Sequence, residues 1–185
     1  MPKDALRSVL AGMVQSVELL FEGPAEECVR EQWAVLEAAG LPSQARHTAV
    51  SNRPHVTLAV AEEIPHAVER DIAAAVGDLP LELVLGGLLV FGSRSCVLAR
   101  LVLPTAELLE LQARLAAVLE QAGIARRPHL EPGRWTPHVT LARRMRPEQL
   151  GEAVGLVGDD TAVEILGHQV RRWDSDARRT WTVLP

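Results

Sequence analysis

The chain has 185 residues, 48% hydrophobic and 23% charged, which is enough to bury a core without disulfides or a structural metal. Its formal net charge of −5 argues against a general nucleic-acid coat protein, and no apolar run is long enough to span a bilayer. Two widely spaced cysteines, Cys28 and Cys96, and the lack of a secretory signal pattern favour a cytoplasmic protein.

The first half of the chain predicts a strand, a helix, a strand, a helix and a hairpin. Residues 14–21 alternate apolar and polar side chains with the period of a strand. A proline and two glutamates open a helix over 24–40, whose final glycine suits the position after a helix C-terminus. An apolar, β-branched strand at 55–59 precedes a helix at 65–76 and a hairpin that turns near 92–95.

The second half predicts the same order of elements. A strand over 96–103 leads to a helix over 106–122, which a Pro-Thr pair precedes and a glycine follows. A second apolar strand at 138–142, a helix at 147–156 and a hairpin turning near 174–176 complete the series. The strand at 96–103 fits both the end of the first series and the start of the second, so it can join the two lobes.

Five short segments recur in the same order in the two halves. The longest pairs are VLEAAGL at 35–41 with VLEQAGI at 118–124, and PHVTLAV at 54–60 with PHVTLAR at 137–143. Both pairs are offset by 83 positions (118 − 35 and 137 − 54), and three later pairs by 81, which one two-residue deletion explains. We interpret the chain as a duplicated unit, with repeat one at about 14–104 and repeat two at about 105–185.

The fold class that follows is α+β. Helices alternate with strands, and the hairpins imply antiparallel pairing. We therefore expect a single bilobal domain over residues 1–185, in which two antiparallel sheets, related by a pseudo-twofold axis and flanked by helices, enclose a central cleft.

The two HVTL strands carry the candidate chemistry. Alternate residues of a strand face the same way, so His55 shares a face with Thr57, and His138 with Thr140. If the repeats meet about a pseudo-twofold axis, two imidazoles and two hydroxyls converge on one small volume. A neutral imidazole can then accept a proton and an imidazolium can donate one, because the histidine pKa lies near working pH.

Each threonine hydroxyl can donate a hydrogen bond to a phosphate oxygen, so the set suits phosphodiester cleavage without a metal. The alternative is that each histidine is an ordinary strand residue preserved by duplication. Packing, however, accounts for Val56 and Leu58 better than for a polar His-Thr pair. A metallohydrolase is disfavoured, because the chain lacks the required cluster of carboxylates and histidines.

The motifs HVTL at 55–58 and 138–141 resemble the paired His-x-Thr-x motifs of the two-histidine phosphoesterase superfamily. The stretch PHVTLAR at 137–143 resembles the second motif of its bacterial 2'-5' RNA ligase branch. The resemblance covers about residues 14–185, because that superfamily is itself a duplicated bilobal α+β fold. It implies hydrolysis of RNA 2',3'-cyclic phosphate ends or small cyclic nucleotides to 2'-phosphates, with reversible 2'-5' ligation in some members.

The resemblance also implies roles for individual residues. His55 takes the place of the general acid and His138 that of the base that activates water, while Thr57 and Thr140 take the phosphate-binding places. Arg143, two residues beyond the second motif, takes the place of an arginine that binds phosphate or ribose. The equivalent residue of the first repeat is Val60, so the site is expected to be chemically asymmetric.

Other residues have both a functional and an ordinary interpretation. Trp135 can stack on a base, or it can brace the loop that precedes His138. Arg53 and Arg144 can steer an anionic substrate, or they can be solvated loop residues. Arg171-Arg172 can lie beside the cleft or at a charged sheet edge. The stretch 126–146, with six arginines and one acid, favours a confined anionic ligand unless it is simply a solvated loop.

Two classes of function remain open. The first is a phosphodiesterase that needs no cofactor or metal and acts, as a monomer without a membrane partner, on RNA 3' ends or cyclic nucleotides. The second is a non-catalytic protein of the same fold that binds nucleotides or RNA ends. The intact pair of histidines favours the enzyme, because a binding protein does not need an acid-base pair.

Overall fold

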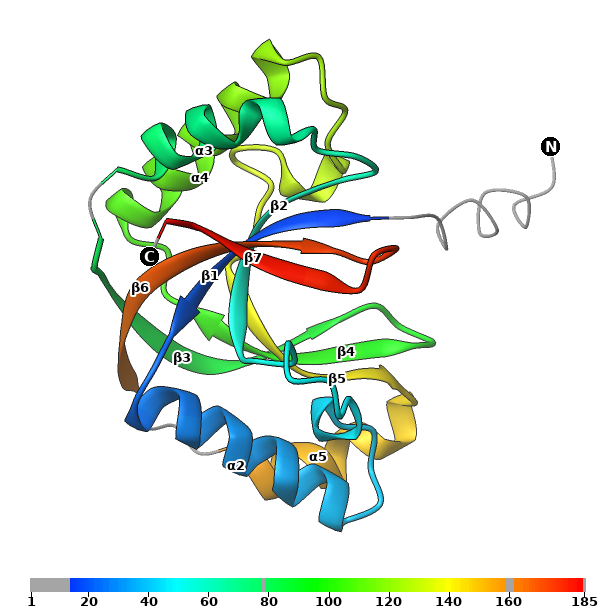
Figure 1. Ribbon diagram of the computed structural model, residues 1–185. Helices are drawn as coiled ribbons and strands as arrows, with labels where there is room; N and C mark the ends of the chain where they lie inside the picture. The colour runs from blue at the N-terminus through cyan, green and yellow to red at the C-terminus, as the bar shows by residue number, and fades with distance from the viewer. Residues whose placement is uncertain (1–13, 78, 159–161, 185) are drawn as a thin grey trace, which may run out of the picture.

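A computed structural model describes residues 14–77, 79–158 and 162–184 (Figure 1). The strands are β1 (Gln15–Phe21), β2 (His55–Ala61), β3 (Leu81–Phe91), β4 (Cys96–Val102), β5 (His138–Met145), β6 (Val163–Asp174) and β7 (Arg179–Leu184). The α-helices are α2 (Pro24–Ala38), α3 (Glu69–Val76), α4 (Ala106–Gln121) and α5 (Leu150–Val157), with 3-10 turns at η2 (Gln44–Arg46), η3 (His66–Val68), η4 (Pro128–Leu130) and η5 (Pro147–Gln149). The α+β class and the expected order of strands and helices are confirmed.

All seven strands belong to one antiparallel sheet, in the order β2-β1-β6-β3-β4-β5, with β7 also paired to β6. The expected two sheets are therefore the halves of one sheet. The long strand β6 joins them, because Val163–Gly167 pair with β3 whereas Val170–Asp174 pair with β7. The sheet does not close into a barrel, but its end strands β2 and β5 come into contact with each other.

The two repeats exchange elements. Strands β1 and β2 of repeat one pair with β6 and β7 of repeat two, and β3 and β4 pair with β5. The helices mix in the same way: α2 packs beside α5 on one side of the sheet, and α3 beside α4 on the other (Figure 1). Each half of the sheet therefore contains strands from both repeats, which ties the two motif strands into one rigid framework.

The core follows from the periodicities of the sequence. The sheet buries alternate residues, such as Val56 and Leu58 of β2, against helix residues spaced by four, such as Leu111 and Leu115 of α4. Among the described residues, no helix combines the length and the apolar character that a membrane span requires.

The equivalent helices α2 and α4 end in the same way. Gly40 and Gly123 have φ of 73° and 71°, the left-handed region that glycine adopts without steric cost. In each case the glycine N–H and the next N–H donate to carbonyls of the last helical turn, at distances between 2.8 and 3.0 Å. The loops that lead to the two motif strands therefore leave their helices in the same direction.

Candidate active site

The two histidines of the motifs have the same hydrogen-bonding arrangement. His55 is the first residue of β2, and its Nδ1 lies 2.7 Å from the carbonyl oxygen of Arg53. His138 is the first residue of β5, and its Nδ1 lies 2.8 Å from the carbonyl oxygen of Thr136. Because a carbonyl oxygen can only accept, Nδ1 carries the proton in each ring. Nε2 is then the atom that can exchange a proton with a ligand.

Two tryptophans hold the motif strands at the edges of the sheet. The indole N–H of Trp33 donates to the carbonyl oxygen of Thr140 at 3.0 Å, and that of Trp135 to the carbonyl oxygen of Thr57 at 3.2 Å. Each tryptophan thus binds the motif strand of the other repeat. Because β2 and β5 are end strands, these bonds satisfy carbonyls that have no neighbouring strand. The bond from Trp135, in the loop before β5, also ties this loop to β2.

Strand pairing brings an unexpected ion pair beside His55. Thr57 pairs with Glu18 of β1, and Glu18 pairs with Arg171 of β6, so the three side chains lie in one row on the same face. Glu18 Oε2 accepts from Arg171 Nε at 2.8 Å, and Oε1 lies 3.6 Å from His55 Nε2. Both members of the ion pair are buried.

The carboxyl of Glu18 stays ionised in this setting. Burial acts to raise its pKa, but the charges of His55 and Arg171 and hydrogen bonds from Ser16 and Arg171 together hold the pKa below its usual value. One signal for this residue is present in the sequence, since Ser16 and Glu18 alternate with the core residues of β1. Such alternation more often marks a solvent-facing side of a strand, so Glu18 was not expected in the site.

His138 has a different environment. Its ring centroid lies 4.7 Å from that of Phe91. Burial is the main cause that lowers the pKa of His138, and the hydrogen bond to the Thr136 carbonyl raises it. The charges of Arg143, His55 and His129 lower the pKa further. The imidazole is therefore neutral at pH 7, with a free lone pair on Nε2. The effect of His55 also shows that the two imidazoles are within electrostatic reach of each other.

An irregularity of β5 places Arg143 on the same face as Thr140. An odd number of positions separates it from Thr140, so in a regular strand the two would face opposite sides. The register of β5 against β4 shifts between Leu98 and Ala99, however, which inserts one extra residue and reverses the alternation. A matching shift in β2 gives Val60 the equivalent orientation.

The electrostatics of Arg143 agree with this orientation. The residue as a whole is exposed, but loss of hydration around its guanidinium lowers the pKa of Arg143. The negative charge of Glu18 raises this pKa, and the positive charge of Arg144 lowers it further. The charge of Arg143 is therefore felt both at Glu18, beside His55, and at His138.

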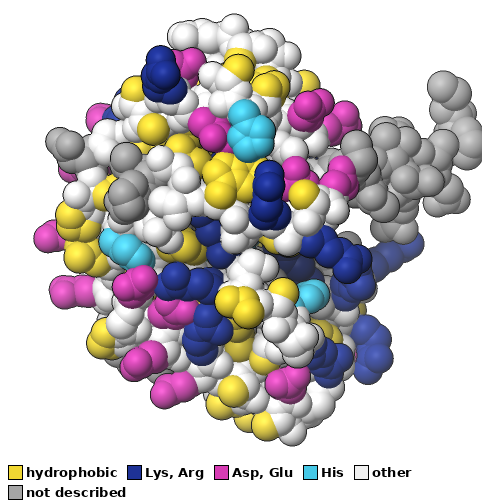
Figure 2. Space-filling model, in the orientation of Figure 1, with side chains coloured by type: hydrophobic (Ala, Val, Ile, Leu, Met, Phe, Trp, Pro, Cys, Tyr) yellow, Lys and Arg dark blue, Asp and Glu magenta, His cyan; other side chains and the backbone are white. Residues whose placement is uncertain are grey.

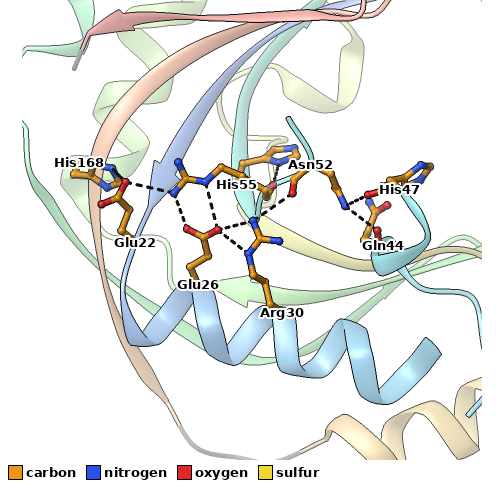
Figure 3. Close-up of polar contacts among 9 residues, drawn as sticks. Glu22, Glu26, Arg30, Gln44, His47, Asn52, His55 and His168 are labelled. Atoms are coloured by element: carbon orange, nitrogen blue, oxygen red, sulfur yellow. Dashed lines mark hydrogen bonds and ion pairs between the residues drawn. The ribbon is translucent and has the colours of Figure 1, made fainter. Parts of the chain in front are cut away.

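The remaining candidates, apart from Arg171, are bound elsewhere or lie exposed. Trp135 is only 8% exposed and is engaged with the β2 backbone, which is the bracing arrangement rather than the stacking one. Arg53 Nη2 lies 2.6 Å from Glu26 Oε2, so its side chain is bound to α2 while its carbonyl orients His55. Figure 3 shows Glu26 extending from α2 on the side where His55 lies. Arg144 is exposed and has a left-handed φ of 58°. Arg171 reaches the site, whereas Arg172 binds Glu69 of α3.

A pocket of about 400 Å³ lies next to this region but does not include either motif histidine. It is lined by Arg30, Trp33 and residues 47–50 of the loop before β2, together with Ala45 and Asn52. Within residues 14–77, 79–158 and 162–184, no three His, Cys, Asp or Glu side chains gather in a way that could hold a metal ion. The site of interest is therefore the area around the two imidazoles.

Comparison with solved structures supports the fold. E. coli LigT, crystallised with 3'-AMP, is 19% identical with a TM-score of 0.55, over 92% of this chain and 94% of LigT. Kluyveromyces marxianus Usb1 is 12% identical with a TM-score of 0.52, over 95% of this chain and all of Usb1. A structure described as a phosphoesterase is 18% identical with a TM-score of 0.54, over 94% and 95% of the two chains. At such identities the likeness concerns the fold.

Comparison with curated protein sequences gave no match. The family model of the 2'-5' RNA ligase superfamily matches residues 25–179, a region that contains both motif strands and most of the sheet. The resemblance inferred from the paired His-x-Thr-x motifs is thereby confirmed. The chain belongs to the 2'-5' RNA ligase superfamily, the two-histidine phosphoesterases.

Proposed function

We propose that this protein is a phosphodiesterase that hydrolyses 2',3'-cyclic phosphates, on RNA ends or on nucleotides, to 2'-phosphates. Reverse 2'-5' ligation is proposed as a secondary activity. The observation that carries the proposal is the matched pair of imidazoles, each with Nδ1 bound to the carbonyl two residues earlier and Nε2 left for a ligand. The structures of LigT with 3'-AMP and of Usb1 with uridine monophosphate make nucleotides reasonable ligands.

The different surroundings of the rings support a division of roles. Burial lowers the pKa of His138, and no described carboxylate forms an ion pair with it, so it is suited to accept a proton from water through Nε2. His55 Nε2 lies 3.6 Å from Glu18 Oε1, so the proposed acid has a carboxylate neighbour at the nitrogen that faces the ligand. In the proposed reaction a bond forms between phosphorus and the water oxygen, and the bond from phosphorus to O3' breaks. His138 takes the proton of the water and His55 protonates O3'.

The other residues of the site hold the phosphate. The hydroxyls of Thr57 and Thr140 are proposed to donate to the two non-bridging oxygens, and Arg143 to offset the charge that develops on them. The dianionic transition state is the form that these donors favour most. A metal or cofactor has no assigned task in this scheme, so we expect activity to survive EDTA.

The proposal is tested with the purified protein and a panel of 2',3'-cyclic nucleotides, RNA ends with a cyclic phosphate, and 2'-5' dinucleotides, each with and without EDTA. We expect 2'-phosphate products from the cyclic substrates in both conditions. Loss of activity in EDTA that a divalent ion restores would contradict the acid-base scheme. Binding of these ligands without turnover would instead favour the non-catalytic alternative. We place the activity in the cytoplasm and in the monomer.

A further inference from the structure

The residues that follow the two motifs differ in charge between the repeats. In repeat two, β5 continues into Arg144 and Arg146, and in repeat one the equivalent positions at the end of β2 are Ala61 and Glu63. The two arginines of repeat two thus correspond to an uncharged residue and an acid in repeat one. One end of the site is therefore suited to a polyanion and the other is not.

A third arginine joins the basic end through strand pairing. Cys96 pairs with Met145, so the β3–β4 turn that contains Arg94 lies beside the end of β5. We call Arg94, Arg144 and Arg146 the basic edge. Figure 2 shows Lys and Arg side chains gathered at the lower right, over the ends of β4 and β5.

The described residues do not neutralise the charges of the basic edge. All three side chains are exposed, and none forms an ion pair within the part of the chain that the structure describes. Glu148 of η5 is the nearest acid in sequence and is exposed as well. By contrast, Arg53, which precedes the first motif, is bound to Glu26, and Arg126, in the loop before the second motif, is bound to Glu131. The basic edge is thus open to a ligand.

The other end of the site has mixed charge. Glu62 and Glu63 follow β2, and the turn between β6 and β7 carries Asp174 and Asp176 beside Arg178 and Arg179. Arg179 lies over the ring of Trp181, with 5.2 Å between its Cζ and the ring centroid. An incoming phosphate chain would meet acids as well as bases at this end.

We propose that the RNA strand attached to the reacting nucleotide leaves the site over the basic edge, with its internucleotide phosphates against Arg94, Arg144 and Arg146. This inference rests on the proposed function and specifies its substrate as an RNA end rather than a free nucleotide. Arg143, which the register of β5 places on the face of Thr140, is followed directly by Arg144, so positive charge continues along the strand to the edge. A mononucleotide has no internucleotide phosphate and cannot use these contacts.

The test compares two substrates of one variant, Arg94→Gln with Arg146→Gln. The substrates are a 2',3'-cyclic mononucleotide and a single-stranded RNA of six nucleotides that ends in a 2',3'-cyclic phosphate. We expect KM for the RNA to rise about three- to tenfold and kcat/KM for the mononucleotide to stay unchanged. The slope of log KM against log salt for the RNA should decrease by about 1.4, since each phosphate contact on a single strand contributes about 0.7.

A matched control removes the same charge from the opposite region of the molecule. Arg70→Gln with Arg114→Gln changes two exposed arginines of α3 and α4 and should leave KM for both substrates unchanged. An unchanged RNA KM in the basic-edge variant overturns the inference. An equal rise of the RNA KM in the control variant also overturns it. So does a rise of the RNA KM in Arg178→Gln with Arg179→Gln but not in the basic-edge variant.

A binding measurement separates this inference from the proposed function. Fluorescence anisotropy of the same RNA ending in a 2'-phosphate requires no turnover. Weaker RNA binding by the basic-edge variant supports the proposed path of the RNA over the basic edge, even if the wild-type protein hydrolyses neither substrate. Equal binding by the wild type and this variant contradicts the edge even if the mononucleotide is hydrolysed as expected.

Discussion

The two halves of the site have nearly the same backbone, but charged side chains lie beside one histidine and apolar side chains beside the other. In the half that contains His55, Thr57 pairs with Glu18, which pairs with Arg171. In the other half, Thr140 pairs with Ala99, which pairs with Leu89. A charged row therefore lies beside one histidine, and an apolar row with Phe91 lies beside the other. The two motif strands thus have matching geometry, but the residues of the neighbouring strands give the two imidazoles different surroundings.

The largest effects are expected from the histidines. His55→Ala and His138→Ala should each lower kcat/KM on a 2',3'-cyclic nucleotide by about 10²- to 10⁴-fold, because each removes one proton transfer. The double variant should lose little more than either single variant, because groups that act as a unit are not additive. Initial rates on the purified variants measure this. Full activity of His138→Ala would refute the proposed site.

The threonines should contribute less. Thr57→Val and Thr140→Val keep the shape of the side chain and remove one hydroxyl donor. A hydrogen bond to a charged group is worth about 1.5–3 kcal/mol, so we expect kcat/KM to fall about ten- to a hundredfold in each variant. Melting temperatures close to that of the wild type would show that the loss concerns the ligand. Unchanged kinetics would remove the hydroxyls from the phosphate-binding set.

Arg143 lies in only one half of the site, and its effect should be visible in the pH dependence of kcat/KM. The rate should rise with pH as His138 loses its proton, at a pH below the ordinary histidine value of 6.5. Because the charge of Arg143 lowers the pKa of His138, Arg143→Gln should raise that pKa and move the rising limb of the kcat/KM profile to higher pH. KM should also increase. Val60→Ala, at the equivalent position of repeat one, is the control, and it should change neither the pH profile of kcat/KM nor KM.

The smallest effect is expected at Trp135. Trp135→Phe removes the indole N–H that donates to the carbonyl of Thr57, which should lower the free energy of unfolding by about 1 kcal/mol. Urea denaturation measures the change. KM for a nucleotide should stay close to the wild-type value, because the ring braces the strand. An increased KM without loss of stability would favour a stacking role instead.

Much of the fold could be predicted because its determinants are local or repeated. The helix ends at Gly40 and Gly123 and the strand periodicity are properties of short segments, and the recurrence of PHVTLA located both motif strands. The exchange of strands between repeats could not be predicted, because a strand's own residues do not specify its partner. The pairing of β6 with β1 is therefore visible only in the structure.

The same reason explains what was missed in the site. Glu18 and Arg171 are 153 positions apart in sequence and meet only because β1 lies between β2 and β6. Arg143 was assigned to the site by resemblance, and its orientation depends on a register shift that the sequence does not reveal. Arg53 illustrates the reverse case, since its charge suggested a ligand contact and its partner is the carboxylate of Glu26.

The most direct test of the central claim is a change of leaving group. In a cyclic substrate with sulfur in place of O3', the leaving thiolate needs no proton, so a general acid becomes dispensable while the base is still required. We predict that His55→Ala recovers most of its lost rate on this substrate and that His138→Ala does not. Equal impairment of both variants, or recovery by His138→Ala alone, would contradict the assignment of His55 as acid and His138 as base.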